Sequence, residues 1–373
     1  MEKFEDRPFI AIWETTQACD LACQHCRACA RPERDAKELD TREAKLLLDS
    51  LADAHVPLCI LTGGDPAKRA DLLELVAHGR ARGLSMGLTP SATPLVTAGL
   101  VAKLAEAGLS RLAVSVDSPN ADIHDAFRGV PGSFELSLRI LRDARAHGIA
   151  TQVNTSVHTR NIHLLAEMAE VASEVGCALW SVFFVVPTGR ADRGMSPAPE
   201  VVERALEQLS EIAERAPFAV KTTAAPHYRR VLLERKKARG ASARHGTHGK
   251  QGLRVNDGRG FLFVSHQGEV FPSGFLPVPC GNVRERDAIE IYRTSPVFRA
   301  LRDPAALKGK CGACEYARVC GGSRARAFAE TGDYLDWDGL CAHVPAGYEA
   351  RAEADRRARR VLPASLPIAA VSG

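Results

Sequence analysis

Short apolar runs alternate with longer amphipathic segments from residue 7 to about residue 215. Their β-branched and apolar composition predicts strands at 9–16, 57–64, 84–90, 111–117, 150–157 and 179–187. Apolar residues at i, i+3, i+4 spacing predict helices at 41–54, 69–82, 96–107, 133–147, 161–175 and 198–214. Asp40 is a suitable N-cap for the first helix, while Gly108 and Gly148 end two others. Six successive βα units predict a parallel sheet with right-handed crossovers.

We therefore expect an α/β fold whose residues 1–217 form a partial (β/α)6 barrel. Ligands of such folds gather at the carboxyl ends of the strands. Residues 218–254 are expected to be a basic connecting segment, since positions 221–260 hold eleven Lys or Arg and only two acids. A hairpin is predicted at 260–275 within a smaller domain, 255–345, and a C-terminal helix and tail at 346–373.

Composition narrows the function classes. A net charge of +4 gives no global sign of nucleic-acid binding, and the basic segment lacks the interleaved aromatics of a single-strand binder. The N-terminus has no signal-peptide pattern and no apolar run is long enough for a membrane span, so we expect a cytoplasmic protein. Eleven cysteines, eight of them in two groups, indicate metal or iron–sulfur ligation in a reducing compartment.

The first cysteine group directly follows the first predicted strand. Cys19, Cys23 and Cys26 have C-x3-C-x2-C spacing. Three thiolates suit a four-iron cluster with one open iron. A structural zinc would need a fourth ligand, which Cys29 or His25 could supply, so the spacing alone leaves both metals open.

Polar and glycine residues follow the other predicted strands at the same rim. The paired glycines Gly63 and Gly64 allow a close backbone approach to a ligand. The ends of later strands offer Ser115, Asp117 and Asn154 for hydrogen bonds to a ligand, and the segment 124–129 offers Arg128 for a carboxylate. Each signal is weak alone, but together they predict one ligand site beside the cysteines.

These motifs resemble the radical S-adenosylmethionine superfamily. The resemblance implies a 4Fe-4S cluster held by Cys19, Cys23 and Cys26, with S-adenosylmethionine on its open iron and reductive cleavage to a 5′-deoxyadenosyl radical. Gly63, Gly64 and Asp65 match the family's glycine-rich motif, although the family more often has Glu at the third place. His25 replaces the usual aromatic residue before the third cysteine, and Cys29 is interpreted as a non-ligand.

The second cysteine group has C-x2-C-x5-C-x20-C spacing and comprises Cys311, Cys314, Cys320 and Cys341. Together with "GEVFPSGFLPVPCGNV" and "CGGSRARAFAETGD", it resembles the SPASM or twitch domain of the superfamily. This implies one auxiliary 4Fe-4S cluster, with a zinc ribbon as the alternative. Ser273 stands where SPASM domains often have cysteine, and Cys280 is interpreted as a non-ligand.

The substrate is the least defined feature. "CQHCRACARP" and "KTTAAPHYRRV" resemble the haem-biosynthesis branch, which includes enzymes of haem and haem d1 synthesis. This implies oxidative decarboxylation of tetrapyrrole propionates, with His227, Tyr228, Arg229 and Arg230 as substrate contacts and flavodoxin or ferredoxin as reductant. The alternatives are a peptide maturase and a non-catalytic iron–sulfur electron carrier. The barrel pattern starts near residue 7, so we expect no N-terminal leader-binding domain.

Overall fold

A single mixed sheet organises the molecule. In the computed structural model, residues 4–238 and 255–349 are described. They form a ten-stranded sheet of order β10-β9-β8-β1-β2-β3-β4-β5-β6-β7. Strands β1 to β8 pair in parallel with one another in this order, whereas β9 pairs antiparallel with both β8 and β10.

The strands have the following bounds: β1 Ile10–Glu14, β2 Leu58–Thr62, β3 Ser85–Leu88, β4 Arg111–Ser115, β5 Ala150–Val157, β6 Leu179–Phe184, β7 Ala219–Thr223, β8 Phe261–Val264, β9 Glu269–Phe271 and β10 Gly281–Asn282. The α-helices are α1 Thr41–Asp53, α2 Leu72–Ala81, α3 Ala98–Glu106, α4 Ala121–Arg128, α5 Ser133–Ala146, α6 Leu165–Glu174, α7 Pro199–Arg215, α8 Tyr228–Ala238, α9 Ala288–Thr294, α10 Pro296–Arg302, α11 Gly309–Ala313 and α12 Arg324–Thr331. Short 3-10 helices lie at Pro66–Lys68, Ile162–Leu164, Arg193–Met195 and Pro304–Ala306.

The predicted α/β barrel is confirmed. Each of the six predicted strands contains an observed strand, and each predicted helix contains or overlaps an observed one. Asp40 caps α1 in a capping box, since its side chain accepts from Glu43 N while the Glu43 side chain accepts from Asp40 N. Helix α4, strand β7 and helix α8 were not predicted, and the last two fall in the segment expected to be only a connection.

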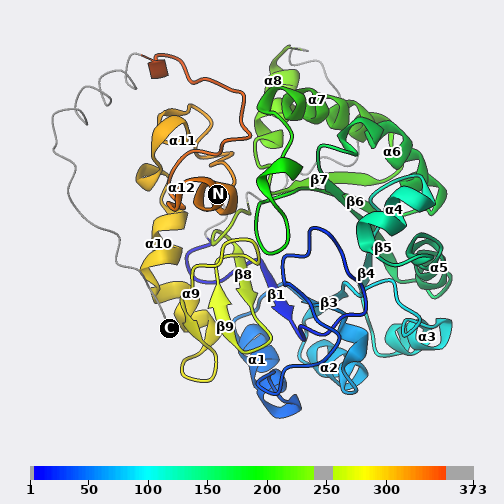
Figure 1. The fold of residues 1–373 in the computed structure, drawn as a ribbon. Helices are drawn as coiled ribbons and strands as arrows, with labels where there is room; N and C mark the ends of the chain where they lie inside the picture. Colours follow the sequence, from blue (N-terminus) through cyan, green and yellow to red (C-terminus); the bar gives the residue numbers. More distant parts are fainter. Residues whose placement is uncertain (1–3, 239–254, 350–373) are drawn as a thin grey trace.

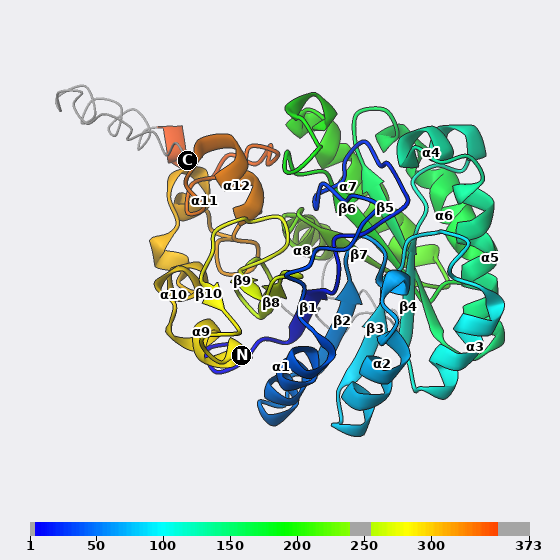
Figure 2. The ribbon, with the colours of Figure 1, turned by 60° about the horizontal axis from the view of Figure 1, so that its bottom comes forward.

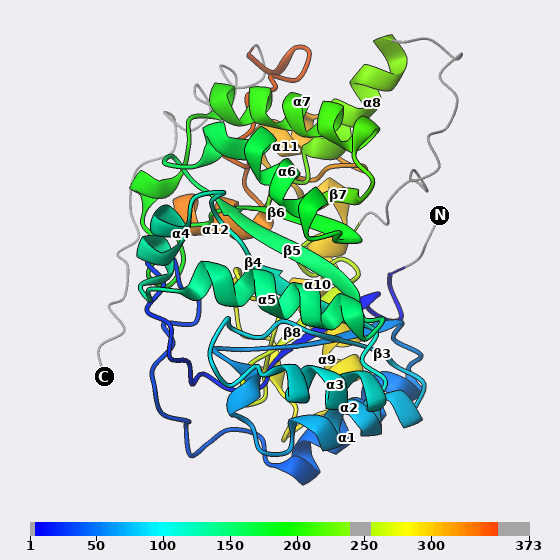
Figure 3. The same cartoon turned by 90° about the vertical axis from the view of Figure 1, so that its right-hand side faces the viewer.

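Helices α1 to α8 form an arc around the strands, as Figures 1 and 3 show. Outward side chains such as Trp13, Leu61 and Trp180 are fully buried in the core between strands and helices. Helix α7 illustrates the pattern, because Val202, Leu206 and other apolar positions at helical spacing lie on its buried face. No helix among the described residues is long and apolar enough to cross a bilayer.

The C-terminal part joins the barrel through its hairpin. The prediction of a hairpin turning at "HQGE" is confirmed, because β8 and β9 pair antiparallel across Ser265–Gly268. Strand β8 also pairs in parallel with β1, so the hairpin continues the barrel sheet. Helices α9 to α12 lie beside this edge (Figure 1), and Tyr292 of α9 donates to Phe4 O at 2.6 Å.

The long segment between β1 and α1, residues 15–40, crosses the carboxyl ends of the central strands (Figure 2). It carries the first cysteine group, and we call residues 15–40 the cysteine loop. Backbone hydrogen bonds from Gly64 to Thr16 and from Ala22 to Arg128 tie it to the loop after β2 and to the end of α4. The strand ends therefore meet the cysteines at one rim, as the sequence predicts.

Candidate functional site

The glycine pair after β2 brings two loops into backbone contact. Gly64 N donates to Thr16 O at 2.8 Å, and Asp65 N donates to Ala18 O at 2.7 Å. A Cβ on Gly64 would lie 2.3 Å from Ala18 O, and one on Gly63 would lie 2.4 Å from Thr16 O. The sequence predicted a close approach to a ligand here. The structure shows a close approach to the backbone of the cysteine loop, and the approach to a ligand stays a prediction.

The three cysteines of the first group lie together with N–H or O–H groups beside their sulfurs. Cys19 and Cys23 are buried, and Cys26 packs against them. Leu21 N donates to Cys19 Sγ at 3.3 Å, and Ala30 N donates to Cys26 Sγ at 3.4 Å. Hydrogen bonds of this kind stabilise the thiolates that hold iron–sulfur clusters. The donor set therefore fits a cluster at this loop.

Neighbouring side chains support the same interpretation. Burial raises the pKa of the Cys19 thiol, while the nearby Ser91 hydroxyl, 3.2 Å from its sulfur, opposes that shift. A buried thiolate thus needs a positive partner such as iron. Cys29, by contrast, is exposed and lies outside the packed group. Its interpretation as a non-ligand stays a prediction.

Asp117 and Arg128, which the sequence assigned to separate ligand contacts, form an ion pair. Arg128 Nε lies 2.6 Å from Asp117 Oδ2, and Arg128 Nη1 lies 3.7 Å from Cys23 Sγ. Ser156 N donates to the other oxygen of Asp117 at 2.7 Å. Burial alone would raise the pKa of Asp117, but Arg128 holds that pKa below its usual range. Asp117 therefore holds the Arg128 guanidinium beside Cys23.

Of the other rim residues, Ser115 and Asn154 lie on strands, whereas Asp65 lies in the loop after β2. Ser115 and Asn154 face each other in register on β4 and β5, and Asn154 Oδ1 accepts from Gln152 Nε2 at 2.7 Å. Asp65 is fully buried and accepts from Thr93 Oγ1 at 2.7 Å. Burial raises the pKa of Asp65, and its carboxylate joins the loops after β2 and β3. Contacts of these residues to S-adenosylmethionine stay predictions.

A stack of aromatic rings beside the cysteines was not predicted. His25 stacks on Phe127 at 4.3 Å between centroids, and Phe127 stacks on His158 at 4.3 Å. The His25 Nε2 atom lies 3.1 Å from the Ser156 hydroxyl. Burial lowers the pKa of His25 to about 3 and that of His158 to about 4, so both rings are neutral near pH 7. Only the unusual His25 within the cysteine motif hinted at this feature.

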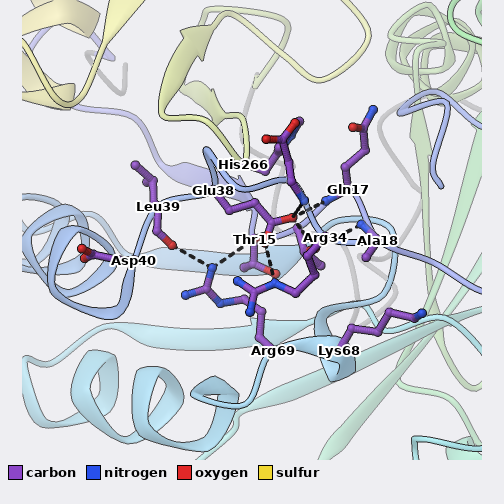
Figure 4. A network of polar contacts seen from close by, with 12 residues as sticks. Thr15, Gln17, Ala18, Arg34, Glu38, Leu39, Asp40, Lys68, Arg69 and His266 are labelled. Atoms are coloured by element: carbon purple, nitrogen blue, oxygen red, sulfur yellow. Dashed lines mark hydrogen bonds and ion pairs between the residues drawn. The ribbon is translucent and has the colours of Figure 1, made fainter. Parts of the chain in front are cut away.

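Polar contacts of Glu38 and Arg69, both buried, also fix the base of the cysteine loop. Glu38 accepts from Thr16 Oγ1 at 2.6 Å. Glu38 also accepts from Arg34 Nε at 2.6 Å, while Arg69 donates to Thr15 O and Leu39 O (Figure 4). These residues come from segments far apart in the sequence, and no local motif indicated them. They hold both ends of the loop against the strand rim.

A second buried carboxylate links the loop to the C-terminal hairpin. Glu14, at the end of β1, forms an ion pair with Arg27 and lies 2.8 Å from His266 Nδ1 in the β8–β9 turn. Arg27 also lies over the Phe263 ring, 4.7 Å from its centroid. Although burial would raise the pKa of Glu14, Arg27 and His266 keep it below its usual value. The hairpin is thereby tied to the residue that follows Cys26.

The four C-terminal cysteines line one pocket. Cys311, Cys314, Cys320 and Cys341 share it with Arg230, Asp338 and His343. Donors again point at sulfur, since Tyr316 N lies 3.4 Å from Cys314 Sγ and Arg324 Nη2 lies 3.4 Å from Cys311 Sγ. A Cβ on Gly322 would lie 2.7 Å from Cys311 Sγ. The residues present therefore fit a metal cluster. Cys280 is not among those that line this pocket.

The residues predicted to contact substrate lie between the barrel and this pocket. Arg230 forms ion pairs with Glu203 at 2.5 Å and with Glu234 at 2.7 Å. Arg229 donates to the backbone at Val319 O, and His227 is fully buried with Nδ1 3.8 Å from Asp338. The Tyr228 hydroxyl donates to Leu209 O at 3.3 Å. Their binding of substrate stays a prediction, but their side chains already contact other parts of the protein.

Known proteins resemble this chain in sequence and in fold. Residues 13–172 match the model of the radical SAM superfamily. The chain is 43% identical over 340 residues to an "AdoMet-dependent heme synthase" of Methanosarcina barkeri, covering 91% of this chain and 97% of that protein. A protein of the same name from Nitratidesulfovibrio vulgaris is 40% identical, with 90% and 92% covered. Streptococcus suis SuiB bound to S-adenosylmethionine shares the fold, at a TM-score of 0.70 and 16% identity, with 91% and 78% covered.

Proposed function

This chain belongs to the radical SAM superfamily, and we propose that it is a haem synthase that oxidatively decarboxylates propionate side chains of an iron coproporphyrin. The observation that carries the proposal is the similarity to haem synthases over nearly the full length of both chains. That similarity covers 91% of this chain and 97% of the Methanosarcina barkeri protein.

The chemistry requires two one-electron oxidations for each propionate. Loss of one hydrogen atom and one electron from the ionised side chain, with release of CO2, leaves a vinyl group. When bound, S-adenosylmethionine and the cluster at Cys19, Cys23 and Cys26 supply the hydrogen-abstracting radical, and an auxiliary cluster at the C-terminal cysteines supplies a one-electron acceptor. Flavodoxin or ferredoxin is the proposed reductant.

The chain's own residues hold these partners in place. Gly63 and Gly64 let the loop after β2 dock on the cysteine loop, and Arg128 places its charge beside Cys23. Asp65, Ser115 and Asn154 are proposed to contact S-adenosylmethionine at the same rim. The proposed domain division places this machinery in residues 1–217 and the auxiliary cysteines in 255–345.

The test is turnover of iron coproporphyrin III by the reconstituted protein under anaerobic conditions. With S-adenosylmethionine and dithionite, we expect haem and 5′-deoxyadenosine, both measured by liquid chromatography and mass spectrometry. The Cys19→Ala/Cys23→Ala/Cys26→Ala variant should form neither product. If wild type binds no porphyrin, as judged by an unchanged Soret band, the tetrapyrrole proposal fails and a peptide substrate becomes the leading alternative.

A further inference from the structure

The inner face of the barrel is partly accessible to solvent at β1 and β2. In β2, Cys59 and Leu61 are fully buried against the helices, whereas the alternate residues Leu58, Ile60 and Thr62 are partly exposed. Side chains alternate across a strand, so the partly exposed positions line the inside of the barrel. The same alternation in β1 gives the inner positions Ile10 and Ile12. The β1–β2 side of the inner face is therefore mainly apolar.

The opposite side of the inner face is polar. Ser115, Asn154, Ser181 and Lys221 lie in register across β4, β5, β6 and β7. Side-chain alternation places Lys221 on the inner face, because its neighbour Val220 packs against the outer core. This register row ends in a positive charge.

A second positive charge lies nearby on the inner face. Arg111 is two positions before Ala113 and four before Ser115, so it has the same orientation on β4. Burial and, next, the charge of Arg111 lower the pKa of Lys221 to about 8. Burial also lowers the pKa of Arg111. The two cations therefore share one region inside the barrel.

Neither cation has an acidic partner in the part of the chain that the structure describes. No ion pair or side-chain hydrogen bond is formed by Arg111 or Lys221 there. The Ser181 hydroxyl, buried beside Lys221 in the row, also has no hydrogen-bond partner. The Arg111 and Lys221 side chains are both partly buried. Partly buried cations without a counter-charge are unfavourable, so their presence favours a site for an anion.

We propose that Arg111 and Lys221 bind a propionate carboxylate of the tetrapyrrole on the inner face of the barrel. The inference rests on the proposed function, because it assumes a polycarboxylate substrate. The apolar positions of β1 and β2 suit the edge of the macrocycle, while the two cations suit its charged side chain. In contrast to Arg230, whose charge is neutralised by two glutamates, these cations are available to a ligand.

The experiment is titration of iron coproporphyrin III into the cluster-loaded full-length protein, followed by Soret absorbance. Lys221→Met keeps the side-chain length and removes the charge, so we expect affinity to fall roughly tenfold to hundredfold. Lys221→Arg should retain most of the affinity. Arg111→Met should weaken binding in the same way. Lys236→Met, which removes an exposed cation of the same basic segment on α8, should bind as wild type does.

Two further measurements distinguish binding of a propionate from binding of S-adenosylmethionine, and test whether the variant is folded. Binding of S-adenosylmethionine, measured by equilibrium dialysis, should be unchanged in Lys221→Met, and the unliganded variant should melt no lower than wild type because a desolvated charge is removed. Wild-type porphyrin affinity in both Met variants would overturn the inference and leave the proposed function standing. Loss of S-adenosylmethionine binding instead would assign the pair to that carboxylate and also overturn it. Absence of porphyrin binding by wild type would overturn both proposals.

Discussion

At the residue scale, Lys221 is a titrating group within the pH range of an ordinary assay. Its pKa is about 8, because burial and the neighbouring Arg111 disfavour the ammonium form. The other members of its register row, Ser115, Asn154 and Ser181, carry no charge. Propionates stay ionised above about pH 5. Protonation of Lys221 is therefore the step that we expect to control carboxylate binding in this range.

We predict that porphyrin affinity is constant below pH 7 and falls as pH rises through 8. The fall follows loss of the lysine proton and approaches roughly tenfold per pH unit, until only the remaining contacts hold the ligand. Lys221→Arg should bind independently of pH between 7 and 10, because a guanidinium stays charged. Soret titrations at several pH values measure both proteins. A wild-type profile that matches the Arg variant would contradict the assignment.

Residues differ in how far sequence alone could assign them. The grouping of Cys19, Cys23 and Cys26 was predictable because all three lie in one short loop, so their spacing carries the geometry. Arg111 and Lys221 were not assigned, since their proximity depends on strand register across the whole barrel. A basic segment was noticed around Lys221, but its charge could not be placed inside or outside the sheet from sequence.

At the scale of elements, the docking of two loops depends on Gly64. We predict that Gly64→Val displaces the cysteine loop, because even its Cβ would lie 2.3 Å from Ala18 O. Iron content should then fall from about eight to about four per chain, as the first cluster is lost and the auxiliary one is kept. Gly99→Val is the matched control, since Gly99 is exposed on α3 and a Cβ there meets nothing closer than 3.8 Å.

Iron and sulfide assays with electron paramagnetic resonance measure both variants. Full iron content in Gly64→Val would show that the loop tolerates the displacement. The structure thereby adds a reason for the glycine pair. The sequence predicts a ligand beside this backbone, which stays a prediction, and the structure shows Gln17 and Ala18 of the cysteine loop against Gly64.

Elements with a clear hydrophobic period were predicted well. Strand β7 and helix α8, which lack such a period, were not. Helix α1 has both an amphipathic pattern and a capping box, so its first residue was found. Strand β7, "AVKTT", is partly exposed at every position, and α8 is rich in cations. Charge alone suggested a connection there. In the structure, β7 is fixed by pairing with β6, which no local pattern of residues 219–223 reveals.

At the scale of the whole molecule, Arg326 connects the auxiliary part to the barrel. This fully buried side chain of α12 donates to Phe184 O and Val185 O at 3.0 Å and to Ala224 O at 2.7 Å. It also lies 3.3 Å from Asp338. The guanidinium thus spans the ends of β6 and β7 and the cysteine region. Its removal would leave the Asp338 carboxylate buried without this partner.

We predict that Arg326→Met lowers the free energy of unfolding by about 3–5 kcal/mol, the usual effect of breaking a buried ion pair. Arg193→Met is the matched control, because the exposed Arg193 donates to the backbone of the same helix from the surface. It should change stability by less than about 1 kcal/mol. Chemical denaturation of both variants supplies the measurement. Equal stability of the two would show that the barrel and the auxiliary part hold together without Arg326.

The two cysteine groups allow radical formation and product formation to be separated. Cys314→Ser removes one of four sulfurs that line the C-terminal pocket, while the loop after β1 is untouched. We therefore predict about four iron per chain, continued formation of 5′-deoxyadenosine and loss of haem, because the proposed electron acceptor is missing. Cys280→Ser is the matched control, since Cys280 lies outside this pocket and its thiol contacts Val278 O. It should keep about eight iron and full haem yield.

Iron assays and product analysis on the same preparations test both. Wild-type haem yield from Cys314→Ser with a single cluster would show that the second group serves the fold alone, and the electron would then have to leave by a path on the barrel.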